Sequence, residues 1–188
     1  MKGKDIKEII KTALSLFLIC AVSAGLLAGI NGITAPEIEK NNLLKADETR
    51  RTVFPEASSF ELSSAPDGTA YYIAFKDTET TGYVFTTRAK GYGGEIEVMT
   101  GINTDGTISR VSILSINETP GLGMKAKNES FLGQYNGKSE KLSVIKNGSP
   151  SENEIDAITS ATISSSAVTQ AVNEALEMYN LIMSGQEE

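Results

Sequence analysis

The sequence predicts an α+β protein in which one N-terminal transmembrane helix precedes a domain with an antiparallel sheet and flanking helices. Three observations support this prediction. No residue from Thr12 to Pro36 is charged, and this stretch is rich in Leu, Ile, Ala and Gly. Four segments between residues 70 and 116 are rich in β-branched and aromatic residues. From Thr162 to about Met183, apolar residues recur at helical spacing.

The uncharged N-terminal stretch is long enough to cross a bilayer, which takes about 20 apolar residues. Lysines precede it and the acids Glu37 and Glu39 follow it, so the positive-inside rule places the N-terminus in the cytoplasm. We therefore expect a single-pass protein of the cell (inner) membrane. Its predicted parts are a cytoplasmic segment 1–11, a transmembrane helix 12–35 and an extracytoplasmic domain 36–188.

Two other uses of the apolar stretch remain open. Ala21-Val22-Ser23 matches the small residues of a signal-peptidase site, but the apolar run continues well beyond it. A lipoprotein needs small residues before its cysteine, whereas Leu18 and Ile19 precede Cys20. A retained anchor is the favoured interpretation.

The remaining elements follow from local signals in chain order. Pro36 suits the first turn of a helix over Glu37–Arg51, which Pro55 ends. A loop over 57–69 comes next, because Ser, Ala, Pro and Gly are frequent there. Asn103–Gly106 is a strong hairpin turn within an antiparallel meander. The predicted strands are Ala70–Lys76, Tyr83–Ala89, Glu95–Ile102, Thr107–Ile116 and Lys141–Lys146, and the helices are Ser130–Tyr135 and Thr162–Met183.

The composition excludes several classes of function. There is no histidine, and Cys20 is the only cysteine, so thiolate metal sites, iron–sulfur clusters and internal disulfides are excluded. We expect no metal site and no catalytic residue. The formal net charge of −7 argues against nucleic-acid binding, because phosphate backbones repel an acidic protein. Redox chemistry would therefore need a bound cofactor.

Two glycine-rich segments have both a structural and a functional interpretation. Gly121–Ala126 matches G-x-G-x-x-A, but Thr119-Pro120 separates it from the preceding strand and later glycines interrupt the following helix, so it is not a dinucleotide fingerprint. A rigid turn with exposed backbone amides is the better interpretation. Lys90–Val98, with three glycines around Tyr92, is either a wide hairpin turn or a loop that approaches a ligand closely.

The start of the last helix contains more hydroxyl groups than a helix cap needs. Thr159 or Ser160 can cap the helix, and Asp156 can accept nearby amides, which leaves Thr162 in the first turn without a structural task. A helix N-terminus stabilises phosphate, so this hydroxyl could hold or be esterified to a phosphate group. The alternative is a simple Ser/Thr-rich cap.

Residues 156–164, DAITSATIS, resemble the flavinylation motif D-x-x-[ST]-G-A-[TS]-x-[ST]. Upstream, Gly91–Gly94, Gly101-Ile102, Asp105-Gly106 and Glu118–Gly123 (ETPGLG) match other blocks of the same family in the same order. With the N-terminal anchor, the chain resembles the G subunit of Rnf-type electron-transport complexes. One position departs from the motif, because Ser160 stands where the family usually has glycine.

The resemblance implies that FMN is joined through its phosphate to Thr162 by a flavin transferase, with Asp156 and Thr159 marking the site. It also implies an electron relay within a complex of integral membrane subunits. That complex passes electrons from ferredoxin to NAD and couples this to sodium or proton translocation. The subunit would not be catalytic alone. The implied cofactor-binding residues also include Ser160, Ala161, Glu118, Thr119, Gly121, Leu122, Gly123, Tyr92 and Gly93.

Two other functions remain open at this point. One is a stand-alone, membrane-anchored extracytoplasmic flavoprotein that passes electrons to external acceptors. The other is an anchored binding module without a cofactor, in which the hydroxyl-rich segment is only a cap.

Overall fold

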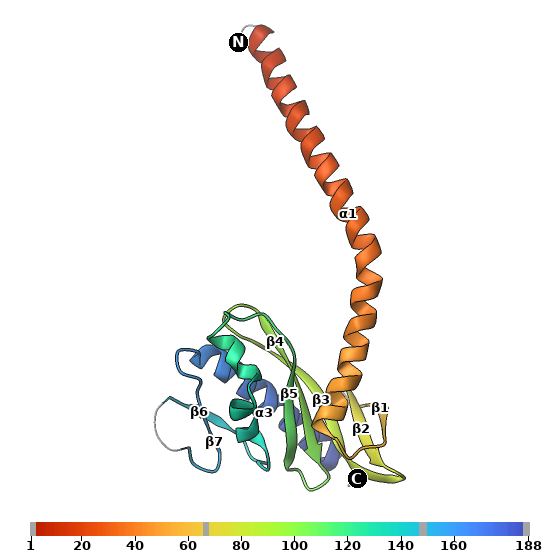
Figure 1. Cartoon of the computed structure of the whole chain (residues 1–188), viewed down its shortest axis with the longest axis vertical. Coiled ribbons are helices and arrows are strands. Elements are labelled where there is room, and N and C mark those ends of the chain that lie inside the picture. The colour runs from red at the N-terminus through yellow and green to blue at the C-terminus, as the bar shows by residue number, and fades with distance from the viewer. Residues whose placement is uncertain (1–2, 66–67, 147–149, 186–188) are drawn as a thin grey trace. The chain divides into compact units, whose positions relative to one another are not determined.

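The computed structural model of this protein describes residues 3–65, 68–146 and 150–185 (Figure 1). The chain divides into two compact units, Met1–Leu44 and Lys45–Glu188. The described residues of the first unit, from Gly3 on, form a helix. The second unit contains the sheet, the other helices and the last turns of the N-terminal helix.

The N-terminal helix α1 runs without interruption from Gly3 to Val53. Within the described residues it is the one helix long and apolar enough to cross a membrane. Lys2, part of the predicted cytoplasmic segment, lies outside the described residues. The expected helix start at Pro36 is wrong, because Pro36 lies inside α1. A proline inside the helix removes only one backbone hydrogen-bond donor, whereas a break in the helix would leave several backbone groups unpaired next to an apolar segment. The uninterrupted helix is therefore the less costly arrangement.

A five-stranded antiparallel sheet forms the centre of the second unit (Figure 1). The strands follow chain order, so the predicted meander is confirmed. The expected loop over 57–69 is wrong in part, because the first strand lies within it and pairs with the second. This polar edge strand is held by backbone pairing, which composition does not reveal. The strands are β1 (Ser59–Ser64), β2 (Ala70–Lys76), β3 (Glu79–Lys90), β4 (Glu95–Asn103) and β5 (Ile108–Ile116).

The two faces of the sheet carry separate apolar cores, because side chains alternate along each strand. Phe85 and Val98 belong to the larger core, under helix α3 (Thr162–Ser184). Their neighbours Val84 and Met99 belong to the smaller core, which is closed by the residues that end α1.

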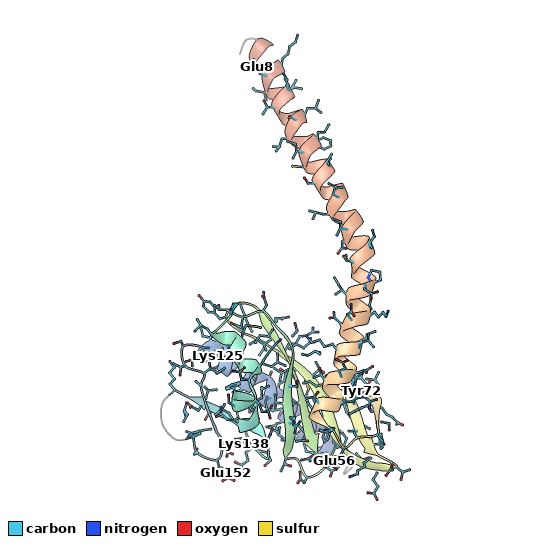
Figure 2. All side chains as sticks on the ribbon, in the orientation of Figure 1. Glu8, Glu56, Tyr72, Lys125, Lys138 and Glu152 are labelled. Atoms are coloured by element: carbon cyan, nitrogen blue, oxygen red, sulfur yellow. The ribbon has the colours of Figure 1, made fainter. Side chains whose placement is uncertain are left out.

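The end of α1 is part of the domain rather than a linker. Phe54 lies where side chains at Gly82 and Gly101 would be, since a Cβ added to Gly101 would meet Phe54 Cε2 at 2.8 Å. The guanidinium of Arg50 lies 4.0 Å from the ring centroid of Tyr72, labelled on β2 in Figure 2. Pro55 disfavours helical backbone at the residue before it, Phe54, which explains why α1 ends at Val53.

Short elements complete the domain beside β5. The predicted helix Ser130–Tyr135 is found as α2 (Glu129–Leu132) followed by the 3₁₀ turn η2 (Gly133–Tyr135), and another 3₁₀ turn, η1 (Gly123–Lys127), precedes them. The predicted strand Lys141–Lys146 is found as β6 (Ser143–Ile145). It pairs in parallel with β7 (Glu154–Asp156), which is too short to show a periodic pattern.

Candidate functional site

A hollow of about 630 Å³ lies at the N-terminus of α3, and we call it the loop hollow. Three segments distant in sequence meet there: the turn between β3 and β4, the segment that follows β5, and the segment that leads into α3. Its lining residues are Tyr92, Glu118, Thr119, Leu122, Gly123, Ser160, Ala161, Thr162, Ile163 and Ser164. No lysine or arginine is among them.

The carboxylate of Glu118 joins two of these segments. The side chain is 7% exposed, and its Oε1 accepts the backbone N–H groups of Tyr92 at 2.7 Å and Gly93 at 3.2 Å. Gly91 and Gly123 close around the carboxylate, since a Cβ on either would collide with it. Close approach thus explains Gly91, and also Gly93, where a Cβ would lie 2.3 Å from Asn117 O. Gly91 N–H also closes the turn to Gly94 O at 2.8 Å.

The segment 119–123 is a tight turn, as the sequence predicted. Thr119 O accepts the N–H groups of Leu122 at 3.2 Å and Met124 at 3.3 Å. Gly121 has a φ of +78°, a conformation that favours glycine. At the end of this turn, a Cβ on Gly123 would lie 2.6 Å from the hydroxyl oxygen of Ser164. The backbone of the turn therefore packs directly against a side chain of α3.

The expected capping of α3 by Thr159 or Ser160 is wrong. The N-cap residue is Ala161, without a side-chain capping bond, and the chain reaches it through a turn in which Ala161 N–H donates to Ile158 O at 2.9 Å. Ser160 has a φ of +65° at the third position of this turn, which explains why the resembling family uses glycine here. The Asp156 carboxylate accepts no hydrogen bond from any described residue. Its backbone pairs with Ile145 of β6 and with the Gln134 side chain.

Ser165, one turn into α3, is the side chain that holds the turn before the helix. It is fully buried, and its hydroxyl accepts Ile158 N–H at 3.0 Å and donates to Ala161 O at 3.0 Å. The motif ends at Ser164 and gave no role to Ser165, because only the three-dimensional path of residues 158–161 brings those backbone groups to its hydroxyl.

Thr162 is half-buried in the first turn of α3, and its hydroxyl makes no hydrogen bond with any described residue. Exposed apolar side chains surround the hollow: Tyr92 is 72% exposed, Leu122 42% and Ile163 56%. A free hydroxyl at a helix N-terminus, beside apolar groups, suits a ligand with a phosphate and a flat aromatic part.

The loop hollow thus brings together most of the site residues predicted from the sequence. Four predicted residues do not line it: Asp156, Thr159, Gly121 and Gly93. Gly93 nevertheless belongs to the Glu118 contact, and Gly121 to the tight turn. Ile163 and Ser164 also line the hollow. Neither was among the predicted cofactor-binding residues, although Ser164 occupies the last position of the flavinylation motif.

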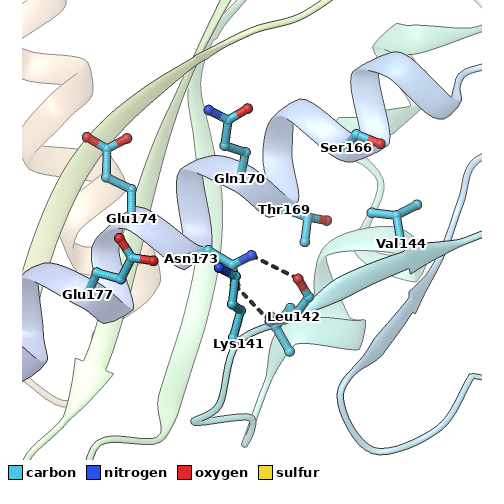
Figure 3. Close-up of a pocket in the computed structure, with 9 residues that line it drawn as sticks. All are labelled: Lys141, Leu142, Val144, Ser166, Thr169, Gln170, Asn173, Glu174 and Glu177. Carbon is cyan, nitrogen blue, oxygen red and sulfur yellow. Dashed lines mark hydrogen bonds between the residues drawn. The ribbon is translucent and has the colours of Figure 1, made fainter.

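A second hollow of about 740 Å³ lies along another side of α3, and we call it the β6 groove (Figure 3). Its polar groups are exposed or already paired. The Asn173 amide accepts Leu142 N–H and donates to Leu142 O, each at 2.8 Å. Glu174 and Glu177 are exposed. No three metal-binding side chains cluster among the described residues, in this groove or elsewhere.

The sequence matches two family profiles. Residues 91–177 match the FMN-binding domain, and residues 1–53 match the RnfG N-terminal region. The first match covers the β3–β4 turn, the ETPGLG segment and most of α3, so this chain contains an FMN-binding domain.

Several relatives are similar to this chain along nearly its whole length. The chain is 36% identical to the G subunit of the proton-translocating ferredoxin:NAD(+) oxidoreductase complex of Clostridium ljungdahlii, over 98% of both chains. It is 40% identical to the G subunit of the Na(+)-translocating ferredoxin:NAD(+) oxidoreductase complex of Acetobacterium woodii, over 93% of both. Identity to the G subunit of the ion-translocating oxidoreductase complex of Methanosarcina acetivorans is 31%, over 92% of this chain and 95% of the relative.

Two crystal structures share the fold. NqrC of Shewanella oneidensis superposes with a TM-score of 0.58 at 18% identity, over 72% of this chain and 73% of NqrC. The C subunit of the Na(+)-translocating NADH-quinone reductase of Parabacteroides distasonis gives 0.55 at 19% identity, over 67% and 77%. At these identities the likeness concerns the fold.

Proposed function

We infer the function from one premise: this chain belongs to the family of G subunits of Rnf-type complexes. It is an FMN-carrying electron-relay subunit of a membrane-bound ferredoxin:NAD oxidoreductase complex that translocates sodium ions or protons. It has partner subunits in that complex and a single membrane helix. A cofactor-free binding module is excluded by the FMN-binding domain, and a stand-alone flavoprotein is disfavoured by relatives that belong to complexes.

The finer proposal is that FMN is attached covalently to Thr162. One observation carries it: this hydroxyl is half-buried, free of hydrogen bonds to described residues, and opens into the loop hollow from the first turn of α3. The oxygen of Thr162 would form a bond to the phosphorus of FMN while the bond from that phosphorus to the leaving group of an activated donor, a phosphoanhydride of FMN, breaks, and the proton of the hydroxyl would go to that leaving group. A maturation transferase would carry out this step.

The residues of the hollow fit such a group. The free N–H groups of the first turn of α3 favour phosphate, which matters because no lysine or arginine of the described residues lines the hollow. Tyr92, Leu122 and Ile163 offer apolar surface to a flat ring system. A hollow of about 630 Å³ lies within the range of about 300–1,000 Å³ usual for small-molecule sites.

Bound FMN supplies the one-electron and two-electron redox chemistry that this chain's side chains lack. The chain's own residues hold it and shape its surroundings. Thr162 would hold the phosphate end, and the apolar side chains of the hollow would cover the ring system. Glu118 holds the β3–β4 turn against the ETPGLG segment, so that two walls of the hollow keep their separation.

Mass spectrometry of the protein from its native membrane tests the attachment. The intact mass should exceed that of the sequence by FMN less one water, and the extra mass should map to the peptide containing Thr162. A modification on Ser164 would keep the function and move the site. An unmodified native protein would overturn covalent attachment.

We also propose that the N-terminus is cytoplasmic and the domain extracytoplasmic, from the lysines that precede the apolar helix. A single cysteine placed at exposed Ser151 in a Cys20→Ala background tests this orientation. A membrane-impermeant maleimide should label it in intact cells. Labelling only after the cells are broken would reverse the proposed orientation.

A further inference from the structure

The motif assigns no task to Ser165, although the side chain is fully buried where the chain enters α3. A buried hydroxyl is costly unless it is paired, and this one is paired twice. It accepts Ile158 N–H and donates to Ala161 O, each at 3.0 Å. These two groups begin and end the turn 158–161, which Ala161 N–H closes to Ile158 O at 2.9 Å.

The turn that Ser165 spans contains a strained residue. Ser160 has a φ of +65°, which a side chain with a Cβ adopts only at a cost. The hydroxyl of Ser165 joins both ends of this turn and so opposes its relaxation. Because Thr162 follows Ser160 by two residues, a relaxed turn would change how its hydroxyl is presented to the hollow.

Ser165 is itself held from the core. Its carbonyl accepts the Thr169 hydroxyl at 3.0 Å, and the Thr169 hydroxyl lies 2.7 Å from that of Tyr135. Burial raises the pKa of Tyr135, so its hydroxyl stays protonated and available for this bond. The contacts run from the η2 turn through α3 to the segment before Thr162.

We propose that Ser165 is a positioning residue that holds the turn 158–161, with Ser160 in its left-handed conformation, and thereby presents Thr162 for flavin attachment. This inference rests on the proposed attachment at Thr162. It adds a residue outside the nine-residue motif and explains how this chain uses serine at position 160. Glycine at 160 adopts the left-handed conformation without strain, so it should make the hydroxyl of Ser165 less necessary.

The experiment measures the rate at which full-length protein gains covalent flavin at limiting transferase, by intact mass. Ser165→Ala should slow this gain by about tenfold, the factor expected when one or two buried hydrogen bonds are lost. Ser166→Ala is the matched control: it removes the neighbouring, exposed hydroxyl, and the rate should stay unchanged. Adding Ser160→Gly to Ser165→Ala should restore most of the rate.

The outcomes separate this inference from the proposed function. Wild-type protein without covalent flavin would overturn attachment itself. Flavinylated wild type with an equally fast Ser165→Ala variant would overturn only the positioning role. The positioning role would also be overturned if adding Ser160→Gly to Ser165→Ala did not restore the rate, whether or not Ser165→Ala folds. Ser165 would then act through core packing alone. The thermal unfolding midpoint of each variant identifies that case.

Discussion

Two hollows border α3, and they differ in what their polar groups do. The β6 groove is the larger, about 740 Å³ against about 630 Å³, but its amide Asn173 is paired with Leu142 and its acids face solvent. The loop hollow is smaller and has an apolar surround, yet it contains the half-buried hydroxyl of Thr162 without a partner among the described residues. A polar group without a hydrogen-bond partner, placed beside apolar side chains, therefore identifies the ligand site better than the volume of the hollow does.

The largest expected effect that distinguishes the two hollows is on flavin attachment. Thr162→Ala should abolish covalent flavin completely, while the free energy of unfolding changes by less than about 1 kcal/mol, since the hydroxyl bonds to no described residue. Flavin fluorescence on a denaturing gel and chemical denaturation measure the two effects. Ser166→Ala, in the β6 groove, should keep the fluorescence. Persistent fluorescence in the Thr162 variant would place the attachment elsewhere.

The Glu118 contact should show that the loop hollow depends on a buried acceptor oxygen. Glu118→Ala leaves the N–H groups of Tyr92 and Gly93 unpaired and should lower the free energy of unfolding by about 2–4 kcal/mol. Flavin incorporation should fall with it, because two walls of the hollow separate. Glu118→Gln, which keeps one acceptor oxygen, should cost less in a denaturant titration. Equal losses in both variants would contradict the role of that oxygen.

The corresponding contact in the β6 groove should matter for stability alone. Asn173→Ala removes both hydrogen bonds to Leu142 and should cost about 1–3 kcal/mol of unfolding free energy. The stoichiometry of covalent flavin, read from the ratio of flavin to protein absorbance, should not change. A loss of flavin in a folded Asn173 variant would remove the distinction between the two hollows.

The smallest expected effect concerns strain at the entrance to α3. Ser160→Gly relieves the left-handed φ of +65° but adds freedom to the unfolded chain, so the free energy of unfolding should rise by at most about 1 kcal/mol. Flavin attachment should be equal or better. Urea unfolding of the variant and the wild type checks the first point. A clear loss of attachment would mean that the transferase recognises the Ser160 side chain.

Elements with a strong local pattern were predicted closely. The strand Ala70–Lys76 and the start of α3 at Thr162 match the structure, because alternation, turn residues and helical spacing act within a few residues. The turn before Thr107 also matches: Gly106 has a φ of +86°, and Asp105 Oδ1 accepts Thr107 N–H at 2.9 Å. The edge strand Ser59–Ser64 was missed because its own residues show no strong strand pattern, and it is identified only by its backbone pairing with β2.

The sequence by itself determined the apolar helix, the meander, the glycine-rich segments and the hydroxyl at Thr162, since each depends on residue type and spacing. The tertiary structure decided which of these meet. It places Glu118 between Gly91 and Gly123, and it assigns the turn before α3 to Ser165 instead of the expected caps. The physical reason is that a hydrogen bond needs its two atoms within about 3 Å. For groups far apart along the chain, only the packing of the sheet against α3 sets that distance.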